Sequence, residues 1–468
     1  MLKKNNYFFK KLEKYKKNNA LILENYKYIS YNELLLISKR ISKKIQKKKK
    51  LIFLLGQNNL ESIAGYISFV NKGHSVALLD FRINEMLLKR LTSIYKPSYI
   101  FCDKKKIKNK NLYSSVLKYK TYVLLKRKKD EKSILNKDLM LLMSTSGTTG
   151  SPKFVRQSYS NVLSNTKNII KYLKIKSKDI TITSLPLTYV YGLSVINTHL
   201  FAGATVVLTN YSMVEKKFWN LINDCKVTNF SGVPYNYSII EKISKKGLPS
   251  SLEYTTQAGG KMNHLLIKNI INIYKKNKIK LIQMYGASEA TSRMSYLKWK
   301  YADRKIGSIG KPIPEGIFYL IDKNGNKIKK KNKRGELVYL GKNVCMGYAE
   351  NLKGLSLPDL NKGLLKTGDI AYEDKDGFYY ITGRKNRYIK IYGIRVNLSE
   401  LESLLFKKGI DVIMKESNEN KIIAYFKNPS KTKEGIKYIS KITSISSNVF
   451  VTKTISKKNL TNNFKYKL

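Results

Sequence analysis

The sequence predicts an α/β protein with a large N-terminal domain of doubly wound, parallel-rich sheets, a small β-barrel-like part, and a small C-terminal α+β domain. Short apolar runs alternate with segments of helical apolar spacing through residues 28–101, an alternation typical of parallel strands joined by helices. After Gly307, short strands separated by Gly, Asn and Lys turns indicate a small antiparallel sheet or barrel. The pattern changes again at Gly383, so we expect domains of residues 1–382 and 383–468.

The expected elements follow one another regularly. Tyr28–Leu34 reads as a strand that turns at Ser30 into a helix, which continues through Ile45. The next segments alternate as strand 51–56, helix 60–70, strand 75–79, helix 87–95 and strand 99–101. The alternation resumes with strand 139–143, a helix from Asn161, strand 179–185, a helix from Gly192, strands 204–208 and 228–230, and then short strands 318–321 and 336–339. Fully apolar runs such as 51–56 indicate strands that are buried on both faces.

Composition fits a folded protein of several domains. The chain has 468 residues, of which 42% are hydrophobic and 11% aromatic. Its formal net charge of +58 would usually indicate nucleic acid or an anionic membrane as a partner. However, the lysines run from end to end together with Asn, Ile and Tyr, all of which have A/T-rich codons. Compositional drift therefore explains the charge better than nucleic-acid binding, which remains the alternative from another function class.

The cysteines and the N-terminus favour a cytoplasmic protein. Cys102, Cys225 and Cys345 lie far apart, so the sequence contains no CxxC metal pair and no disulfide framework. Residues 1–17 are basic and aromatic but lack the continuous apolar core of a signal peptide. No stretch reaches about 18 uninterrupted apolar residues, and we expect no membrane span.

One loop has the composition of a polyphosphate site. The segment Ser144-Thr145-Ser146-Gly147-Thr148-Thr149-Gly150-Ser151-Pro152-Lys153, called the phosphate loop below, follows an apolar strand. Glycines let backbone N–H groups turn toward an anion, hydroxyls add donors, and Lys153 adds a positive charge. The loop is not a Walker A sequence, because no Gly-Lys-Ser/Thr opens a helix. By composition alone, a flexible Ser/Thr/Gly loop would be the commoner case.

Further motifs decide whether this segment is a polyphosphate-binding loop or only a flexible loop. The phosphate loop resembles that of the acyl-adenylate-forming superfamily, which includes acyl-CoA synthetases, peptide-synthetase adenylation domains and beetle luciferase. Other segments resemble the family's motifs in the family's order: Tyr285-Gly286-Ala287-Ser288-Glu289 (YGxTE), Gly335-Glu336-Leu337 with Gly347-Tyr348 (GEL…GY), Thr367-Gly368-Asp369 (TGD), and Gly383-Arg384 through Ile389-Lys390, Gly393 and Arg395-Val396 (GRxxxxIKxxGxRV). The resemblance covers nearly the whole chain.

The resemblance implies an ATP site. Thr145, Ser146, Gly147, Thr148, Thr149, Gly150 and Lys153 would hold the β- and γ-phosphates. Ser288 would contact the α-phosphate, and Glu289 would help to bind Mg²⁺, a hard cation that prefers carboxylate and phosphate oxygens. Asp369 would accept hydrogen bonds from the ribose hydroxyls, and Arg384 would lie nearby. Tyr285 would stack on adenine, and Gly286 is also expected to belong to the ATP site. Gly259, Gly260 and Lys261 resemble the stretch between the adenine and acyl sites.

The same resemblance implies two half-reactions and a mobile C-terminal domain. Family members first adenylate a carboxylic acid and then transfer the acyl group to a pantetheine thiol, rotating the small domain between the steps. Asn386 occupies the hinge position, where the family usually has Asp or Lys, while Lys390 and Gly393 belong to the segment lining the thiol tunnel. Lys465, in Thr461-Asn462-Asn463-Phe464-Lys465, is the candidate for the lysine that bridges the carboxylate and the α-phosphate, although Phe464 replaces the usual glycine.

The resemblance to the family also restricts the class of acid substrate and the kind of thiol acceptor that we expect. Amino-acid-activating members carry an Asp just after the aromatic residue of the pocket motif, where this sequence has Val190. Burying an ammonium group without a counter-charge is costly, so we expect a fatty, hydroxy or aryl acid in a neutral pocket. The expected lining is Tyr189, Val190, Tyr191, Asn236, Gln257, Ala258 and Met284. The acceptor would be coenzyme A or, as the alternative, the phosphopantetheine of an acyl carrier protein.

Overall fold

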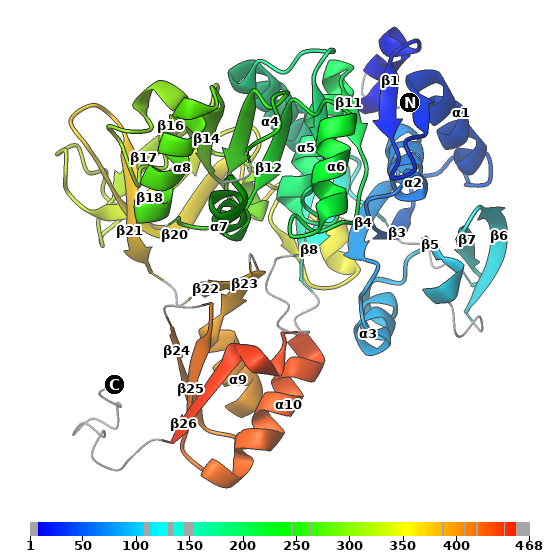
Figure 1. Cartoon of the computed structure of the whole chain (residues 1–468). Coiled ribbons are helices and arrows are strands. Elements are labelled where there is room, and N and C mark those ends of the chain that lie inside the picture. The colour runs from blue at the N-terminus through cyan, green and yellow to red at the C-terminus, as the bar shows by residue number, and fades with distance from the viewer. Residues whose placement is uncertain are drawn as a thin grey trace. The chain divides into compact units, whose positions relative to one another are not determined.

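The computed structural model describes residues 8–106, 112–129, 134–144, 153–244, 247–262, 264–385, 388–392, 394–406, 408–417, 420–443 and 445–454. The chain forms two compact units: the larger contains most of the chain up to Gly383, and the smaller contains the chain from Arg384. Within the described residues, the larger unit holds three sheets and the smaller unit two (Figure 1).

An eight-stranded sheet in the order β19-β9-β8-β4-β3-β5-β7-β6 forms one layer of the larger unit. Its strands are β3 (Leu51–Gly56), β4 (Ser75–Asp80), β5 (Tyr99–Asp103), β6 (Tyr113–Tyr119), β7 (Tyr122–Arg127), β8 (Leu139–Ser144), β9 (Phe154–Ser158) and β19 (Tyr348–Ala349). The central strands β5, β3, β4 and β8 are parallel, and every residue of β3 is buried. Helices α2 (Leu60–Asn71) and α3 (Glu85–Tyr95) connect β3 to β4 and β4 to β5, and α1 (Tyr31–Ser42), which leads from the other large sheet to β3, packs against α2.

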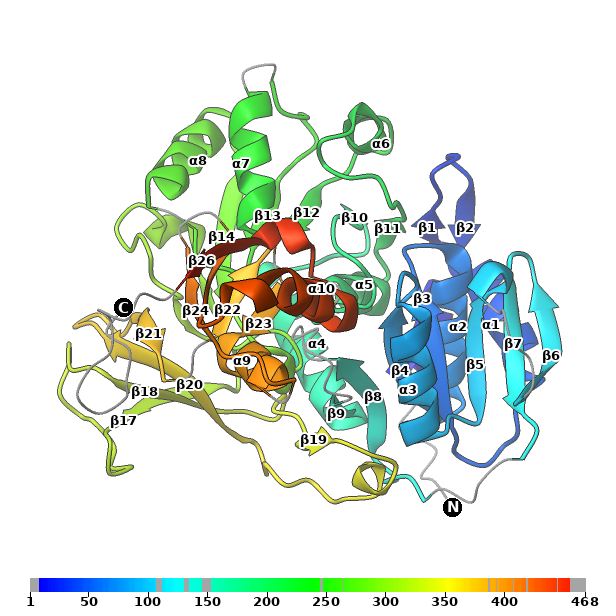
Figure 2. The same cartoon turned by 90° about the horizontal axis from the view of Figure 1, so that it is seen from below.

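A nine-stranded sheet in the order β16-β15-β14-β13-β12-β10-β11-β1-β2 forms a second layer. Its strands are β1 (Asn19–Ile22), β2 (Tyr28–Ser30), β10 (Ile180–Ile182), β11 (Thr205–Val207), β12 (Asn229–Gly232), β13 (Tyr254–Gln257), β14 (Lys280–Tyr285), β15 (Ser295–Leu297) and β16 (Lys311–Pro312). Helices α5 (Val190–Ala202), α6 (Lys216–Asp224), α7 (Pro234–Ile243) and α8 (His264–Lys276) connect its strands from β10 to β14, while α4 (Tyr159–Leu173) follows β9 and contacts β8, β9 and α5. Helices α7 and α8 pack side by side, as Figure 2 shows.

Local sequence explains where the helices begin and which are buried. Ser30 caps α1: its side chain accepts from the backbone N–H of Glu33, whose carboxylate in turn accepts from the backbone N–H of Ser30. Ser158 and Asn161 form the same reciprocal cap on α4. Helix α5 is buried along nearly its whole length, as expected for a helix that is apolar all round.

The small β part is a four-stranded antiparallel sheet in the order β17-β18-β20-β21. These strands are β17 (Ile317–Ile321), β18 (Gly335–Leu340), β20 (Leu364–Glu373) and β21 (Tyr379–Arg384). Phe318 packs between Tyr339 and Tyr379 at ring-centroid distances of 5.4 and 5.1 Å, which fills its core.

The smaller unit has a hydrophobic core of its own. It contains the hairpin β22 (Tyr388–Ile391) and β23 (Ile394–Asn397), and a sheet of β24 (Val412–Glu416), β25 (Ile422–Phe426) and β26 (Phe450–Thr454). Its helices are α9 (Leu398–Phe406) and α10 (Thr432–Thr443). Leu401, Met414, Phe426 and Ile439 are among its buried residues.

Short 3-10 helices complete the described secondary structure. They are η1 (Phe8–Tyr15), η2 (Lys104–Lys106), η4 (Ser288–Ala290), η5 (Trp299–Tyr301), η6 (Lys353–Leu355), η7 (Pro429–Lys431) and η8 (Ser447–Val449).

The predicted α/β class is confirmed, and the differences have local causes. Helix α1 ends at Ser42 instead of continuing to Ile45, and β10 is shorter than the expected strand 179–185 because the chain leaves the sheet before Pro186. The hairpin of β6 and β7 was not expected, because β6 at the sheet edge is largely exposed and carries no continuous apolar run.

The described helices give no membrane-crossing segment: none of them is both long enough and apolar enough to span a bilayer.

Two buried histidines make stability depend on pH. Burial lowers the pKa of His74 and of His199 to about 4, below the value of about 6.5 in an unfolded chain. The unfolded chain therefore takes up protons first as pH falls, and we expect the free energy of unfolding to drop by about 2 kcal/mol per histidine between pH 6.5 and pH 5. Urea unfolding at several pH values measures this loss.

The variant His199→Gln should lose less stability on acidification than the unmodified protein. His264→Gln is the matched control, because His264 is exposed. An identical loss in the His199→Gln variant would contradict the assignment of the pH dependence to this histidine.

Candidate functional site

The carboxyl ends of four parallel strands define one edge of the nine-stranded sheet. Strands β10, β12, β13 and β14 run in the same direction, and their register places Gly232 beside Gln257, which in turn lies beside Gln283. In sheets of this type, ligands bind outside the carboxyl ends of the strands. The YGASE segment begins at the last residue of β14, so the topology brings it to this edge.

A tight turn follows β14. A Cβ atom at Gly286 would lie 1.6 Å from the carbonyl oxygen of Ser292, so only glycine fits. Ser292 itself has a φ of 132°, a strained value for a residue with a side chain. The backbone N–H of Met294 donates to the carbonyl of Tyr285 at 2.9 Å and closes the turn. Residues 287–291 lie within this closed turn.

Two of the predicted site residues meet through Tyr348. The Tyr348 hydroxyl donates to Oε1 of Glu289 at 2.7 Å. Nζ of Lys153 lies 3.6 Å from the centroid of the Tyr348 ring and 4.0 Å from Oε1 of Glu350. One tyrosine therefore contacts both the carboxylate expected to bind Mg²⁺ and the lysine expected to bind phosphate. The GY motif had indicated Tyr348, but no role for its side chain was expected.

The position of Tyr348 is fixed by β9 and a buried arginine. Tyr348 pairs with Val155 where β19 joins β9. Arg156 is fully buried, and its guanidinium donates to the carbonyl oxygens of Met346, Tyr348, Leu357 and Pro358. Satisfied donors of this kind hold the 346–358 segment against β9. The neighbouring Gln157 donates through Nε2 to the carbonyl of Ser288 at 3.0 Å, so β9 also supports the YGASE turn.

The two residues expected to bind adenine and ribose, Tyr285 and Asp369, are in contact with each other in the structure. Asp369 on β20 is 2% exposed, and its Oδ2 accepts a short hydrogen bond from the Tyr285 hydroxyl. Thr367 holds the turn of the TGD motif, because its Oγ1 accepts from the backbone N–H of Asp369 and donates to the carbonyl of Leu337. Tyr285 and Asp369 come from two different sheets, and no sequence spacing shows this contact.

The glycine pair after β13 allows a close approach of side chains. Gly259 has a φ of 84°, and a Cβ there would lie 2.9 Å from the hydroxyl of Tyr189. A Cβ at Gly260 would lie 2.9 Å from Cγ of Pro234. Lys261, which follows, is exposed. Close packing therefore explains both glycines.

Part of the expected acyl pocket gathers in one cluster. The buried members are Leu185, Tyr191, Val195, Ala258 and Met284, and the half-buried ones are Tyr172, Tyr189, Val233, Ile282 and Tyr296. We call this set the tyrosine cluster. The rings of Tyr172 and Tyr296 stack at 4.1 Å. Burial raises the pKa of Tyr172 and of Tyr189 to about 12, so both hydroxyls are neutral at pH 7.

The other expected pocket residues have different surroundings. Val190 packs in the main core of the larger unit with Leu193, outside the tyrosine cluster. The Asn236 side chain accepts from the backbone N–H of Val233 and caps α7. Gln257 donates to the carbonyl of Gly260 at 2.8 Å. The structure gives Asn236 and Gln257 local backbone contacts, which their sequence positions did not indicate.

The tyrosine cluster also contacts a charge that was not expected. Arg293, 2% exposed, lies with its guanidinium 4.4 Å from the centroid of the Tyr191 ring and hydrogen-bonds to Met284. The expected neutral lining did not include this charge. The signal in the sequence was a single basic residue in the otherwise uncharged segment that follows Glu289, and the abundance of basic residues elsewhere obscured it.

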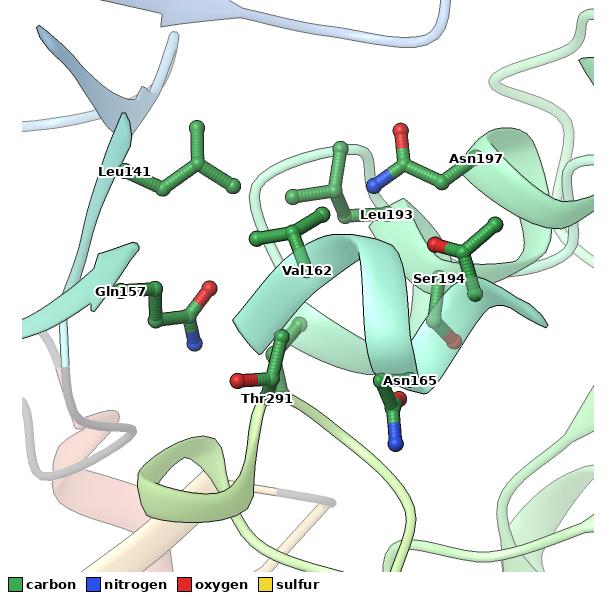
Figure 3. A pocket seen from close by; sticks show the side chains of 10 residues that line it. Leu141, Gln157, Val162, Asn165, Leu193, Ser194, Asn197 and Thr291 are labelled. Atoms are coloured by element: carbon green, nitrogen blue, oxygen red, sulfur yellow. The ribbon is translucent and has the colours of Figure 1, made fainter. Parts of the chain in front are cut away.

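A small cavity lies beneath the turn, between α4 and α5 (Figure 3). Its lining includes Gln157, Asn165, Ser194 and Thr291, which come from β9, α4, α5 and the turn itself. Within the described part of the chain, Gln157 Oε1 and Asn165 Oδ1 are buried acceptors without a hydrogen-bond partner. A polar cavity of this kind suits a single bridging water and is too small for a substrate.

Several predicted residues lie outside the described residues: Thr145, Ser146, Gly147, Thr148, Thr149, Gly150, Asn386, Gly393 and Lys465. Arg384 ends β21 and Lys390 lies in β22. Their assignments stay predictions.

The donor set at Glu289 fits one Mg²⁺ shared with phosphates. Among the described residues, no group of three or more His, Cys, Asp or Glu side chains could hold a metal ion by itself. Mg²⁺ is usually held by one or two carboxylates together with substrate phosphates. Glu289 is half-buried, and its one hydrogen bond among the described side chains comes from the neutral Tyr348 hydroxyl, so its charge is available to a cation.

Known proteins resemble this chain over most of its length. Residues 8–349 match a family described as AMP-binding enzyme. A 2-succinylbenzoate–CoA ligase of Bacillus licheniformis is 32% identical over 284 residues, which cover 58% of this chain and 57% of that protein. An indoleacetate–CoA ligase of Aromatoleum aromaticum is 26% identical over 402 residues, 81% of this chain and 78% of that protein. The chain thus spans little more than half the length of the first of these relatives.

A solved structure shares the fold. An o-succinylbenzoate CoA synthetase from Bacillus subtilis, a double mutant bound to a product analogue, superposes with a TM-score of 0.78 at 22% identity. The match covers 99% of this chain and 97% of that one.

The turn after β14 gives a direct test of the geometry. Gly286→Ala places a methyl group against a backbone carbonyl that cannot move away without opening the turn, so we expect a loss of about 3 kcal/mol in unfolding free energy. Gly383→Ala is the matched control, because a Cβ there meets nothing within 4 Å. Denaturant unfolding of both variants measures the difference, and equal stabilities would show that the turn is looser than described.

Proposed function

The chain belongs to the AMP-binding enzyme family, matched over residues 8–349, and from this premise we propose that it is an ATP-dependent acid–thiol ligase. A carboxylate oxygen of the acid attacks the α-phosphorus of ATP, the bond to the β-phosphate bridging oxygen breaks, and pyrophosphate leaves. The thiol of coenzyme A then attacks the acyl carbonyl of the adenylate, and AMP leaves. The products are a thioester, AMP and pyrophosphate.

The observation that carries this proposal is the grouping of Lys153, Tyr348 and Glu289. Negative charge builds up on the leaving pyrophosphate, and positioned cations stabilise it. Lys153, the last residue of the phosphate loop, supplies one positive charge, and Ser288, next to Glu289, donates to the α-phosphate. Asp369 and Tyr285 bind the nucleoside, and their hydrogen bond keeps the carboxylate and the ring in a fixed relation.

Magnesium would be held by Glu289 and the phosphates of ATP, and when bound it supplies charge neutralisation during phosphoryl chemistry. Tyr348 orients the Glu289 carboxylate through its hydroxyl. The arrangement is of the type in which an outer hydrogen bond fixes a metal ligand.

The second half-reaction depends on the smaller unit. In this proposal, residues 1–382 form the nucleotide- and acid-binding domain and residues 383–468 rotate about Asn386. Lys465 serves adenylation, while Lys390 and the segment around Gly393 serve thiol transfer. The break between the two compact units after Gly383 supports a boundary at this point.

We favour an aryl acid and coenzyme A. The two CoA ligases reported above are named for aryl acids, 2-succinylbenzoate and indoleacetate. The stacked rings of Tyr172 and Tyr296 and the nearby Tyr189 and Tyr191 offer aromatic surface for such an acid. An acyl carrier protein is the alternative acceptor. All three cysteines are buried free thiols, consistent with the cytoplasmic location that is part of this proposal.

ATP–pyrophosphate exchange with Mg²⁺ tests the adenylation step. A panel of fatty, hydroxy, aryl and amino acids should include a non-amino acid that supports exchange. Lys465→Ala should lower that exchange about 100-fold, because it removes one charge from the transition state. Lys467→Ala, two residues further on, is the matched control.

Each other outcome has a defined meaning. Unchanged exchange in Lys465→Ala would contradict the role of that lysine. Thioester formation with a holo carrier protein but not with coenzyme A would favour the alternative acceptor. No exchange with any acid, together with RNA binding that weakens steeply with salt, would favour the nucleic-acid alternative.

Tyr348 allows the two contacts to be separated. Tyr348→Phe removes the hydroxyl from Glu289 but keeps the ring beside Lys153, so we expect the Mg²⁺ concentration for half-maximal exchange to rise about 10-fold. Tyr348→Leu removes both contacts and should also raise the KM for ATP. Tyr28→Phe, at an exposed tyrosine of β2, is the control. An unchanged Mg²⁺ requirement in Tyr348→Phe would contradict the positioning role.

A further inference from the structure

Asn343 is a buried side chain to which the proposed reaction gives no role. It is 1% exposed and lies between β18 and β19. Its Oδ1 accepts from the Tyr339 hydroxyl at 2.7 Å. Its Nδ2 donates to the carbonyl of Ala290 at 2.8 Å and to the carbonyl of Arg293 at 3.1 Å, and the second of these carbonyls also accepts from Nδ2 of Asn165. The Asn343 amide thus uses both of its donors on the turn that follows β14.

The two residues between those carbonyls have unfavourable backbone angles. Thr291 and Ser292 have φ values of 58° and 132°, in the region that favours glycine. Strained residues of this kind persist only where the surrounding structure holds them in place. The Asn343 amide binds the carbonyl on either side of the pair, and the Thr291 hydroxyl donates to the Asn343 carbonyl at 2.6 Å. The side chain and the backbone of Asn343 therefore clamp the strained pair.

The small antiparallel sheet fixes the orientation of this amide. Tyr339 packs against Phe318 in the core of that sheet, at a ring-centroid distance of 5.4 Å. A Cβ at Gly341 would lie 2.6 Å from the Tyr339 hydroxyl and 2.7 Å from Oδ1 of Asn343, so the absence of a side chain there makes room for their hydrogen bond. Because backbone carbonyls can only accept, Nδ2 faces the turn and Oδ1 faces the hydroxyl.

The segment that begins at Asn343 also contacts Glu289 twice. The backbone N–H of Cys345 donates to the carbonyl of Glu289 at 2.8 Å. The Tyr348 hydroxyl donates to the Glu289 carboxylate at 2.7 Å. Residues 343–348 therefore hold the backbone of Glu289, its carboxylate and the strained pair that follows it. Of these contacts, only those of Asn343 fix the strained pair.

We propose that Asn343 is a positioning residue for the Mg²⁺ and ATP site: by clamping the strained pair, it keeps the Glu289 carboxylate in the orientation that binds the cation. The inference rests on the proposed ligase function, in which Glu289 and the phosphates of ATP hold Mg²⁺. Without the clamp, Thr291 and Ser292 relax toward ordinary backbone angles, and Glu289 turns with them. Loss of a hydrogen bond outside a ligand set typically changes metal affinity by about 10- to 100-fold.

Binding of ATP with and without Mg²⁺ tests this role without turnover. Titration calorimetry in the absence of an acid gives both dissociation constants and the fraction of protein that binds. Asn343→Leu keeps a similar size but removes the hydrogen-bonding groups. We expect it to lower the ratio of the Kd without Mg²⁺ to the Kd with Mg²⁺ by about 10-fold. A purely structural role would reduce the fraction that binds and leave this ratio unchanged.

Asn58→Leu is the matched control. Asn58 is buried, and its Nδ2 donates to two backbone carbonyls, those of Leu185 and Thr209. Its Oδ1 accepts from the backbone N–H of Leu187 at 2.9 Å. The substitution thus removes the same number of side-chain hydrogen bonds from a buried site away from the turn, and it should cost stability but keep the ratio.

Tyr339→Phe is a milder change that decides the matter if Asn343→Leu does not fold. It removes the hydroxyl that orients the amide and keeps the ring against Phe318, so we expect the ratio to fall about 3-fold. Tyr379→Phe is its control. Tyr379 packs on the same ring, and its hydroxyl donates to the Phe318 carbonyl, so its loss leaves the turn intact and should not change the ratio.

The outcomes separate the two proposals. An unchanged ratio in Asn343→Leu, or in Tyr339→Phe if only that variant folds, would overturn the positioning role and leave the ligase function intact. An equal fall in Asn58→Leu would also overturn it, because the effect would then follow from lost stability. ATP binding that Mg²⁺ does not strengthen in the unmodified protein would overturn the metal role of Glu289 and that of Asn343 together. An unmodified protein that binds no ATP in either condition would overturn the ligase function itself.

Discussion

The contact between Gly286 and the carbonyl oxygen of Ser292 is the constraint on which the candidate site depends. Gly286 has no side chain, so its backbone can approach the Ser292 carbonyl closely and the chain can reverse immediately after β14. The reversal holds Ser288 and Glu289 at the carboxyl edge of the parallel strands and returns the chain so that Arg293 enters the tyrosine cluster. Ser292 accepts an unfavourable φ of 132° as part of the same turn. One backbone contact thus positions both the YGASE residues and a residue of the tyrosine cluster's surroundings.

Three separate segments converge on this turn. Strand β9 contributes Gln157, which holds the carbonyl of Ser288, and Arg156, which holds the segment containing Tyr348. Tyr348 then contacts Glu289. Strand β20 contributes Asp369, which meets Tyr285. Glu289 and the YGASE turn are thus supported by neighbours outside the proposed set of ligands, whereas Tyr285 and Asp369 support each other, and such support holds charged groups in one geometry.

Charge in this protein has to be judged by burial and partners. Compositional drift explains most of its 90 lysines and arginines. Exposed ion pairs, moreover, contribute little to stability. The informative groups are the few that the fold removes from water. Arg156 is satisfied by carbonyls, Arg293 has only weak partners, and Glu289 carries a negative charge beside a neutral tyrosine. Burial thus distinguishes these few charged groups from the many exposed lysines of a uniformly basic sequence.

The sequence by itself determined the α/β class and the alternation of strands and helices over residues 51–101, and it supplied the motif residues from which a nucleotide site is proposed, because apolar periodicity and the spacing of Gly, Ser and Thr are local properties. Only the tertiary structure decided that Tyr348 joins Glu289 to Lys153, that Tyr285 meets Asp369, and that Val190 packs away from the tyrosine cluster. It alone brought Arg293 against the tyrosine cluster. Such contacts join residues far apart in the chain through sheet register and packing, which no local pattern encodes.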